Sequence, residues 1–383
     1  MRILAVALMT AAGAALVTWI YAIGLDNQSV TGRDYIEYWA AERLLVEGRN
    51  PYDPAGILHE QQAAGMADSA PKVSLSPPVA VFFALPLGRL NAKTGLIAWQ
   101  LISLACLCLS ILLLWQEFGR QGAGYHLLGL CFPPVISCLM AGQLGIFFLL
   151  GAAFFLRFNR TQPWLAGAAL LPCALKPHLF LPLAVVLALW SLRRRDLRVP
   201  VGFLLALAVS CSLSLWVDPS IWGQYRQLIH AAHIMDVFLP TASVALRFAI
   251  DRDAHWIEFV PVAVACAWAA WYYWTRRQTW EWNRQGMLLL MVSVAATPYS
   301  WFSDEAVLFP AVLAAIYAAE KTPRFWMLFG LVALGGMVGT IAAIQLPSPF
   351  YLWTAPAWLA WYLYAASSQR RAIAREENVA GSA

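Results

Sequence analysis

Residues 96–115 read LIAWQLISLACLCLSILLLW, a run that contains no charged side chain. At a rise of about 1.5 Å per residue, a helix over this run is about 30 Å long, which matches the hydrocarbon core of a bilayer. Two further runs, residues 3–23 and 199–217, are similarly apolar. The sequence therefore predicts an all-α polytopic membrane protein.

The composition of the whole chain favours the same class. Of the 383 residues, 61% are hydrophobic and 12% are charged, whereas soluble proteins carry about 25% charged residues. The net charge of +5 comes from basic residues in small clusters between apolar runs, so we interpret them as determinants of topology and expect no nucleic-acid partner. All seven cysteines lie in apolar segments, so neither disulfides nor a metal site is predicted.

Hydropathy and positive charge together predict a topology. We expect about twelve crossings, at residues 3–22, 95–115, 125–140, 143–157, 163–175, 177–191, 199–217, 257–275, 286–301, 305–319, 325–345 and 350–366. With the N-terminus in the cytoplasm, the arginine clusters at 193–198 and 276–284 and the C-terminus are also cytoplasmic, as positively charged loops usually are.

The apolar segment 77–90 decides the parity of this topology. It is only about 14 residues long, and counting it as a crossing would place nearly all arginine clusters outside. We therefore interpret it as a re-entrant segment. The prediction is a single transmembrane domain over residues 1–366, with outer loops at 24–94 and 218–256, followed by a disordered cytoplasmic tail at 367–383.

The first outer loop contains a candidate catalytic carboxylate. In residues 34–48, DYIEYWAAERLLVEG, most apolar side chains share one helical face. Gly48 is a typical residue for the C-terminal end of a helix. This pattern predicts an amphipathic helix that lies on the membrane and begins at Asp34. Because Asp34 and Glu37 have the spacing of a capping box, Asp34 is interpreted as an N-cap, a catalytic carboxylate, or both.

Two polar hinges interrupt short apolar segments, Gly142-Gln143 and Lys176-Pro177. Non-helical backbone at this depth is buried in protein or lines a water-filled cavity. Lys176 is therefore a candidate for binding a phosphate, the alternative being a lysine that extends to the membrane interface. The neighbouring His178 and the outer-loop Arg247 are further candidates for the same phosphate.

The order of these motifs resembles glycosyltransferase family 87. The resemblance rests on the run Asp34-x-x-x-Tyr38-x-Ala40-Ala41-x-x-Leu44-Leu45-x-x-Gly48-x-Asn50-Pro51-Tyr52, and then on Pro77-Pro78, Pro86-Leu87, Gly142-Gln143 and Lys176-Pro177. It is weaker in the second half of the chain. There Thr297-Pro298-Tyr299-Ser300-Trp301 is similar to the family's Ser-Pro-x-x-Trp turn, and Thr241-Ala242-Ser243 ahead of Arg247 departs from the family's Asn-Gln-Ser.

The resemblance implies a fold of the GT-C type and an enzyme that uses a polyprenyl-phosphate sugar, above all mannose. It implies that the aspartate of the first outer loop, here Asp34, is the catalytic base. An inverting transfer needs one such base, and a phosphate leaves without a metal cofactor. The expected reaction joins the sugar to a glycan or glycolipid acceptor on the outer, periplasmic face of the plasma membrane.

Five further residues are candidates for binding the substrates. They are Tyr38, Tyr52, Gln143, Trp301 and Asp304. For Gln143 the alternative is that its amide satisfies free backbone groups at the hinge, and for Asp304 it is a solvated turn.

Two other classes of function stay open from the sequence. A lipid or sugar transporter or flippase is the main alternative, although transporters often show matching broken helices in two halves, whereas here the longest loop lies at the start of the chain. A non-catalytic scaffold is supported only by the departure at Thr241.

Overall fold

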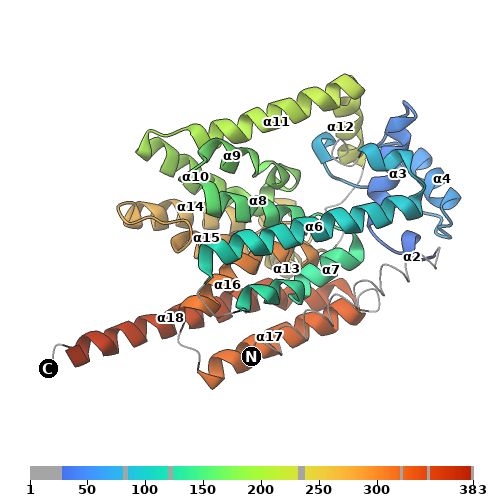
Figure 1. Cartoon of the computed structure of the whole chain (residues 1–383). Coiled ribbons are helices and arrows are strands. Elements are labelled where there is room, and N and C mark those ends of the chain that lie inside the picture. Colours follow the sequence, from blue (N-terminus) through green and yellow to red (C-terminus); the bar gives the residue numbers. More distant parts are fainter. Residues whose placement is uncertain are drawn as a thin grey trace.

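The computed structural model describes residues 28–80, 85–119, 124–231, 238–319, 322–342 and 346–380. The predicted crossing at 3–22 lies outside these ranges. Within them the regular elements are all helical (Figure 1). They are α2 (Gln28–Thr31), α3 (Tyr35–Val46), α4 (Pro54–Ala63), η1 (Leu85–Arg89), α6 (Ala92–Phe118), η2 (Tyr125–Leu130), α7 (Pro133–Ala141), α8 (Gly145–Phe158), α9 (Pro163–Ala168), η3 (Leu171–Leu175), η4 (Pro177–Phe180), α10 (Leu181–Arg194), α11 (Arg198–Val217), α12 (Ile221–Ala231), α13 (Ala242–Ile250), η6 (His255–Phe259), α14 (Val260–Arg276), α15 (Gln285–Ala295), η7 (Phe302–Leu308), α16 (Phe309–Ala318), α17 (Pro323–Ala342), η9 (Ser348–Trp353) and α18 (Thr354–Ala380).

Three of these helices are long and apolar enough to cross a membrane: α6, α11 and α17. Their axes are roughly parallel in Figure 1. Large apolar side chains on α11 are exposed, among them Leu204, Leu205, Val209 and Trp216. A soluble protein rarely exposes so large an apolar surface, so these side chains face lipid. The chain is a multi-pass membrane protein.

Most of the other predicted crossings within the described residues coincide with helical segments that are shorter than a bilayer, whereas the one at 350–366 falls largely on the 27-residue helix α18. Helices α8, α15 and α16 contain 14, 11 and 10 residues. Helix α16 is almost completely buried inside the protein, so its apolar side chains form core rather than lipid-facing surface. Hydropathy does not distinguish these two environments, and the number of about twelve crossings stays a prediction.

Close approach of α9 and α11 depends on two glycines. A Cβ atom on Gly167 would lie 2.0 Å from the carbonyl oxygen of Val199, and one on Gly202 would lie 2.4 Å from that of Trp164. Small residues at such crossings allow helix backbones to pack in direct contact, which replaces the hydrophobic driving force that lipid removes. The two glycines therefore fix the position of α9, which leads into η3 and the Lys176 hinge.

Helix α3 differs from the predicted surface helix. Most of its side chains are buried, including Ala40, Ala41 and Leu44 on the side opposite to the predicted apolar face. The helix packs against α4, η1 and α6. Gly88 makes this packing possible, because a Cβ atom there would lie 2.5 Å from the backbone of Glu42. The prediction of one polar, water-facing side on α3 was wrong, because residues on both sides of the helix are buried; its position on the membrane stays a prediction.

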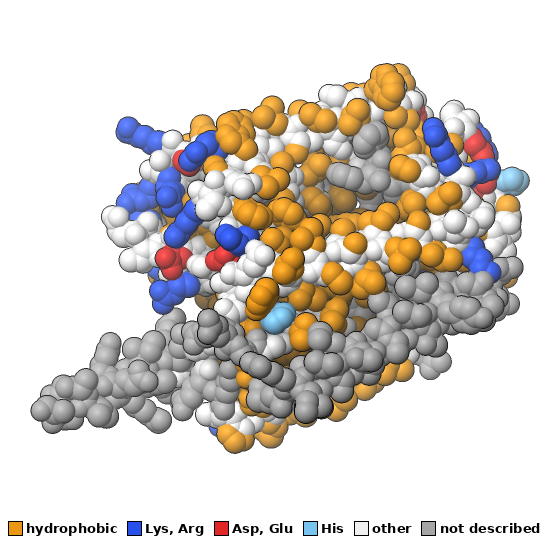
Figure 2. All heavy atoms as spheres, viewed as in Figure 1, with side chains coloured by type: hydrophobic (Ala, Val, Ile, Leu, Met, Phe, Trp, Pro, Cys, Tyr) orange, Lys and Arg blue, Asp and Glu red, His pale blue; other side chains and the backbone are white. Residues whose placement is uncertain are grey.

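Charged side chains are concentrated at the ends of the molecule. Figure 2 shows Lys and Arg gathered at the end where Figure 1 places the α10–α11 and α14–α15 connections, and hydrophobic side chains along the flank. Helices α3 and α12 lie at the opposite end (Figure 1). Helix α18 continues to Ala380, through most of the stretch predicted to be a disordered tail.

Candidate functional site

Asp34 directly precedes α3 and is held by the turn between α7 and α8. The amide nitrogen of Gln143 donates a hydrogen bond of 2.8 Å to Asp34 Oδ2, and the Tyr38 hydroxyl donates one of 2.9 Å to Gln143 Oε1. Because a carboxylate only accepts hydrogen bonds, this arrangement fixes the orientation of the amide. Asp34 does not cap α3 with its side chain, so within the described residues the capping-box interpretation is not supported.

Gly142 places Gln143 at this position. Its φ of 74° lies in the left-handed region, and it ends α7 as glycine typically ends a helix, with its N–H bonded to the carbonyl oxygen of Cys138. A Cβ atom at residue 142 would lie 2.7 Å from Tyr35 Cβ. The turn between α7 and α8 therefore packs directly against the start of α3, which brings Gln143 to Asp34.

We expect Gly142→Ala to destabilise the protein by about 1–3 kcal/mol, because the substitution combines a strained left-handed backbone with a steric clash. The measurement is the apparent unfolding temperature in detergent. Gly223→Ala is the matched control, because a Cβ atom at this α12 position meets no atom within 4 Å. Equal unfolding temperatures for the two variants would contradict the prediction.

Lys176 lies between η3 and η4 and forms a buried ion pair. Its Nζ donates hydrogen bonds of 2.8 Å to both carboxylate oxygens of Asp304, whose side chain is completely buried. Asp304 Oδ2 also accepts a hydrogen bond of 2.9 Å from the backbone N–H of Trp301. The Tyr299 ring lies 5.5 Å from the ammonium group, which is cation–π range. These contacts hold Lys176 in one position.

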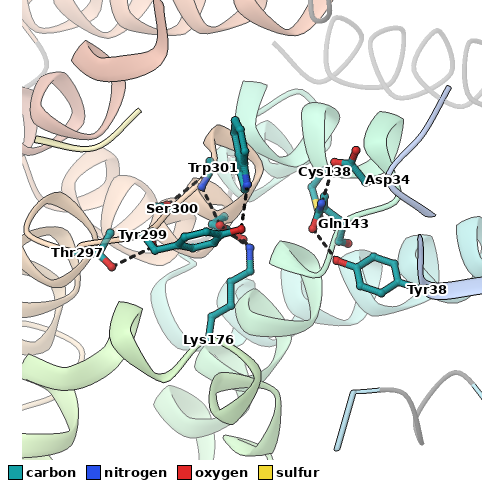
Figure 3. Close-up of polar contacts among 10 residues, drawn as sticks. Asp34, Tyr38, Cys138, Gln143, Lys176, Thr297, Tyr299, Ser300 and Trp301 are labelled. Atoms are coloured by element: carbon teal, nitrogen blue, oxygen red, sulfur yellow. Dashed lines mark hydrogen bonds and ion pairs between the residues drawn. The ribbon is translucent and has the colours of Figure 1, made fainter. Parts of the chain in front are cut away.

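The two groups of residues face each other across one cavity of about 420 Å³. Figure 3 shows Asp34, Tyr38 and Gln143 on one side and Lys176, Tyr299 and Trp301 on the other. The cavity is lined by Asp34, Glu37, Tyr38, Val73, Ser74, Leu75, Ser76, Gln143, Leu175, Lys176, His178, Ile229, Leu239, Glu258, Phe259, Pro298, Tyr299 and Trp301. Its volume is typical of small-molecule sites, and its wall combines apolar side chains with a few convergent polar groups.

Six of the residues predicted from the sequence line this cavity: Asp34, Tyr38, Gln143, Lys176, His178 and Trp301. The other three do not. Tyr52 is buried against Tyr225, and its hydroxyl donates a hydrogen bond of 3.1 Å to the carbonyl oxygen of the lining residue Ser76. Arg247 is 1% exposed and pairs with Glu258. Asp304 lies behind Lys176, so it is neither a solvated turn residue nor a wall of the cavity.

The cavity also contains polar residues that the sequence did not identify as site residues. Glu37 was interpreted only as part of a capping box, although its spacing of one helical turn from Asp34 also places both carboxyl groups on one face. Burial, with the charge of Asp34 as the next cause, raises the pKa of Glu37 to about 8. Glu258 had no recognisable sequence pattern, and Tyr299 stood only at a variable position of the turn Thr297–Trp301. Within the described residues no group of three His, Cys, Asp or Glu side chains is placed to hold a metal ion.

Comparison with known proteins identifies one family. The sequence model of glycosyltransferase family 87 matches residues 75–298, more than half of the chain. The matched range includes both hinges, Gln143 and Lys176, begins after Asp34 and ends before Trp301. No curated protein and no solved structure matches the chain.

Proposed function

Because the chain belongs to glycosyltransferase family 87, we propose that it is an inverting membrane enzyme that transfers a sugar, above all mannose, from a polyprenyl-phosphate donor to a glycan or glycolipid acceptor. Membership in the family makes the protein a transferase with a sugar donor and an acceptor. The donor class, the sugar and the mechanism are the proposed part.

The observation that carries the proposal is that Asp34 and Lys176 line the same cavity and face each other across it. Inversion needs a base that takes the proton of the acceptor hydroxyl while the leaving group departs from the opposite face of the sugar. Asp34 is held by Gln143 but keeps its second oxygen for such a proton. Lys176 lies across the cavity, where a leaving phosphate requires a hydrogen-bond donor.

The phosphate site in this proposal consists of Lys176 and His178. An ammonium group has three N–H donors, and two of them bond to Asp304, so one remains for a phosphate oxygen. Asp304 then positions Lys176 instead of binding substrate. Arg247 is likewise assigned to the support of the cavity wall, because its partner is the lining residue Glu258.

Apolar side chains give the cavity a path for an isoprenoid chain. Leu175, Ile229, Leu239 and Phe259 all belong to its wall. Tyr38, Gln143 and Trp301 are the proposed contacts to sugar hydroxyls, since amides and aromatic rings both suit a sugar. Tyr52 acts only indirectly, through Ser76.

The orientation we propose follows from the distribution of charge. Helices α3 and α12, which contribute to the cavity, lie at the end opposite to the larger group of Lys and Arg side chains; the α3 end has fewer of them, next to acidic and histidine side chains (Figures 1 and 2). Positively charged ends usually remain in the cytoplasm. The cavity therefore opens to the outer, periplasmic side of the plasma membrane in this proposal.

We expect the purified protein in lipid nanodiscs to form a product from a radiolabelled polyprenyl-phosphate sugar and a membrane glycan extract, and none from a nucleotide sugar. The measurement is labelled product, followed by linkage analysis of the anomeric configuration. Retention of configuration would contradict the inverting mechanism. Uptake of the sugar into proteoliposomes without a product would instead support a transporter.

A further inference from the structure

Four arginines at the adjacent ends of α10 and α14 form what we call the arginine cluster: Arg193, Arg194, Arg276 and Arg277. The two helices pack against each other. The hydroxyl group of Tyr273 on α14 interacts electrostatically with Arg277 and with both members from α10. The cluster is therefore one positively charged surface built by two helices, at the end of the molecule where Lys and Arg gather in Figure 2.

No carboxylate compensates the charge of the arginine cluster. In the part of the chain that the structure describes, none of its four members forms an ion pair. The acidic residues of the adjoining loops already have arginine partners, since Asp196 lies 2.8 Å from Arg198 and Glu281 lies 3.6 Å from Arg160. Asp196 acts on Arg194 only from beyond ion-pair distance. This excess of positive charge favours binding of an anion.

The helix ends account for part of this charge but leave hydrogen-bond donors unused. The C-terminal end of a helix dipole favours a cation, and Arg277 donates a hydrogen bond to the carbonyl oxygen of Trp274. Arg276 donates one to the hydroxyl oxygen of Thr275. A guanidinium group has five N–H donors, so both arginines keep donors for a ligand. Pairs of such donors match the oxygens of a phosphate group.

An exposed apolar stripe on α14 leads to the cluster. Trp271, Trp274 and Arg277 follow one another at a spacing of three residues, so they share one helical face. The two indole side chains are 60% and 59% exposed, and the guanidinium carbon of Arg277 lies 4.5 Å from the centroid of the Trp274 ring. On α10, Leu192 beside Arg193 is exposed as well. Cations next to exposed apolar side chains match a lipid, whereas a soluble anion would leave the stripe unused.

We propose that the arginine cluster binds the phosphate headgroup of an anionic phospholipid, whose acyl chains lie along Trp271 and Trp274. Basic pockets between membrane helices bind such headgroups through charge and hydrogen bonds. The lipid belongs to the leaflet at this end of the molecule, which is the cytoplasmic leaflet in the orientation proposed above. None of the four arginines lines the cavity of Asp34 and Lys176, so this site is separate from the site of sugar transfer.

Native mass spectrometry of the purified full chain in detergent tests the site, with phosphatidylglycerol and phosphatidylcholine as the lipids added. We expect the wild type to bind one phosphatidylglycerol in preference to phosphatidylcholine. Arg193→Gln with Arg277→Gln should weaken this binding about 25-fold, or about fivefold for each arginine removed. The control is Arg160→Gln with Arg198→Gln, which removes the same charge from the same end. Because these two arginines pair with carboxylates, the control should leave the affinity nearly unchanged.

A second pair of substitutions keeps the test independent of the folding of one variant. Arg194→Gln with Arg276→Gln removes the other two members of the cluster and should cause a similar loss. Equal weakening by the cluster variants and the control would show that only the general positive charge of this end attracts the lipid, and it would overturn the proposal. Equal binding of both lipids by the wild type would do the same. Displacement of phosphatidylglycerol by inorganic phosphate would identify a soluble anion as the occupant and would also overturn it.

Discussion

Asp34→Asn is expected to lower the rate of sugar transfer by about 10² to 10⁴, because the acceptor hydroxyl loses the base that takes its proton. Asparagine has nearly the same shape, and its oxygen can still accept the hydrogen bond from Gln143. The variant should therefore fold and bind the donor as the wild type does. The measurement is kcat with a polyprenyl-phosphate sugar, together with the donor Kd. The loss should appear in kcat.

Asp53→Asn is the matched control for this experiment. Asp53 is also an aspartate before a helix, where it accepts hydrogen bonds from the backbone N–H groups of Ala55 and Gly56, and it does not line the cavity. Asparagine caps helices as well as aspartate does, so this variant should retain full activity. Equal activity of the Asp34→Asn and Asp53→Asn variants would remove Asp34 from the mechanism.

Lys176→Met is expected to have the largest effect on stability. Removal of one partner from a buried ion pair typically destabilises a protein by about 3–5 kcal/mol, because the remaining charge is left without compensation. Here the remaining group is Asp304, which is completely buried and would keep only the backbone N–H of Trp301 from its present partners. The apparent unfolding temperature in detergent should fall, and donor binding should weaken.

A double variant separates the two effects. In Lys176→Met with Asp304→Asn neither partner is charged, so we expect the unfolding temperature to recover while donor binding remains weak. Arg198→Met is the control, since Arg198 pairs with Asp196 at the protein surface, where such pairs contribute about 0–1 kcal/mol. A double variant that is stable and binds the donor with the wild-type Kd would show that Lys176 has only a structural role.

The sequence predicted those features that depend on neighbouring residues. The run at 96–115 lies inside α6, and the hinges at Gly142-Gln143 and Lys176-Pro177 are breaks between helices in the structure. Glycine after an apolar segment and proline after a lysine are local signs of a helix end. The family resemblance, which rests on these motifs, was confirmed by the match over residues 75–298.

Pairs of residues that are distant in the sequence could not be predicted in this way. Lys176 and Asp304 are 128 positions apart, and no periodicity relates them. The same reason explains why Asp304 was interpreted as a turn residue or substrate contact. Arg247 lies only 11 positions from Glu258, but whether a charged side chain faces a cavity or a buried partner depends on the packing of α13 against η6.

The burial of α3 shows a further limit of sequence patterns. Its apolar residues suggested one stripe interrupted by Glu42, yet Ala40, Ala41 and Leu44 on the opposite side are buried as well, and Glu42 itself is 1% exposed. The contact that buries Glu42 comes from η1, which approaches through Gly88. The importance of Gly88 depends on a helix more than 40 positions earlier, so its role could be recognised only in the folded chain.

The account depends most on one claim, that Asp34 and Lys176 act on the same bound donor. An experimental structure of the protein in nanodiscs with a bound polyprenyl-phosphate sugar analogue tests it most directly. We predict a phosphate oxygen within hydrogen-bond distance of Lys176 Nζ, with the C1 atom of the sugar between that phosphate and the Asp34 carboxylate. A phosphate bound outside the cavity, with Asp34 turned away from the sugar, would contradict the account.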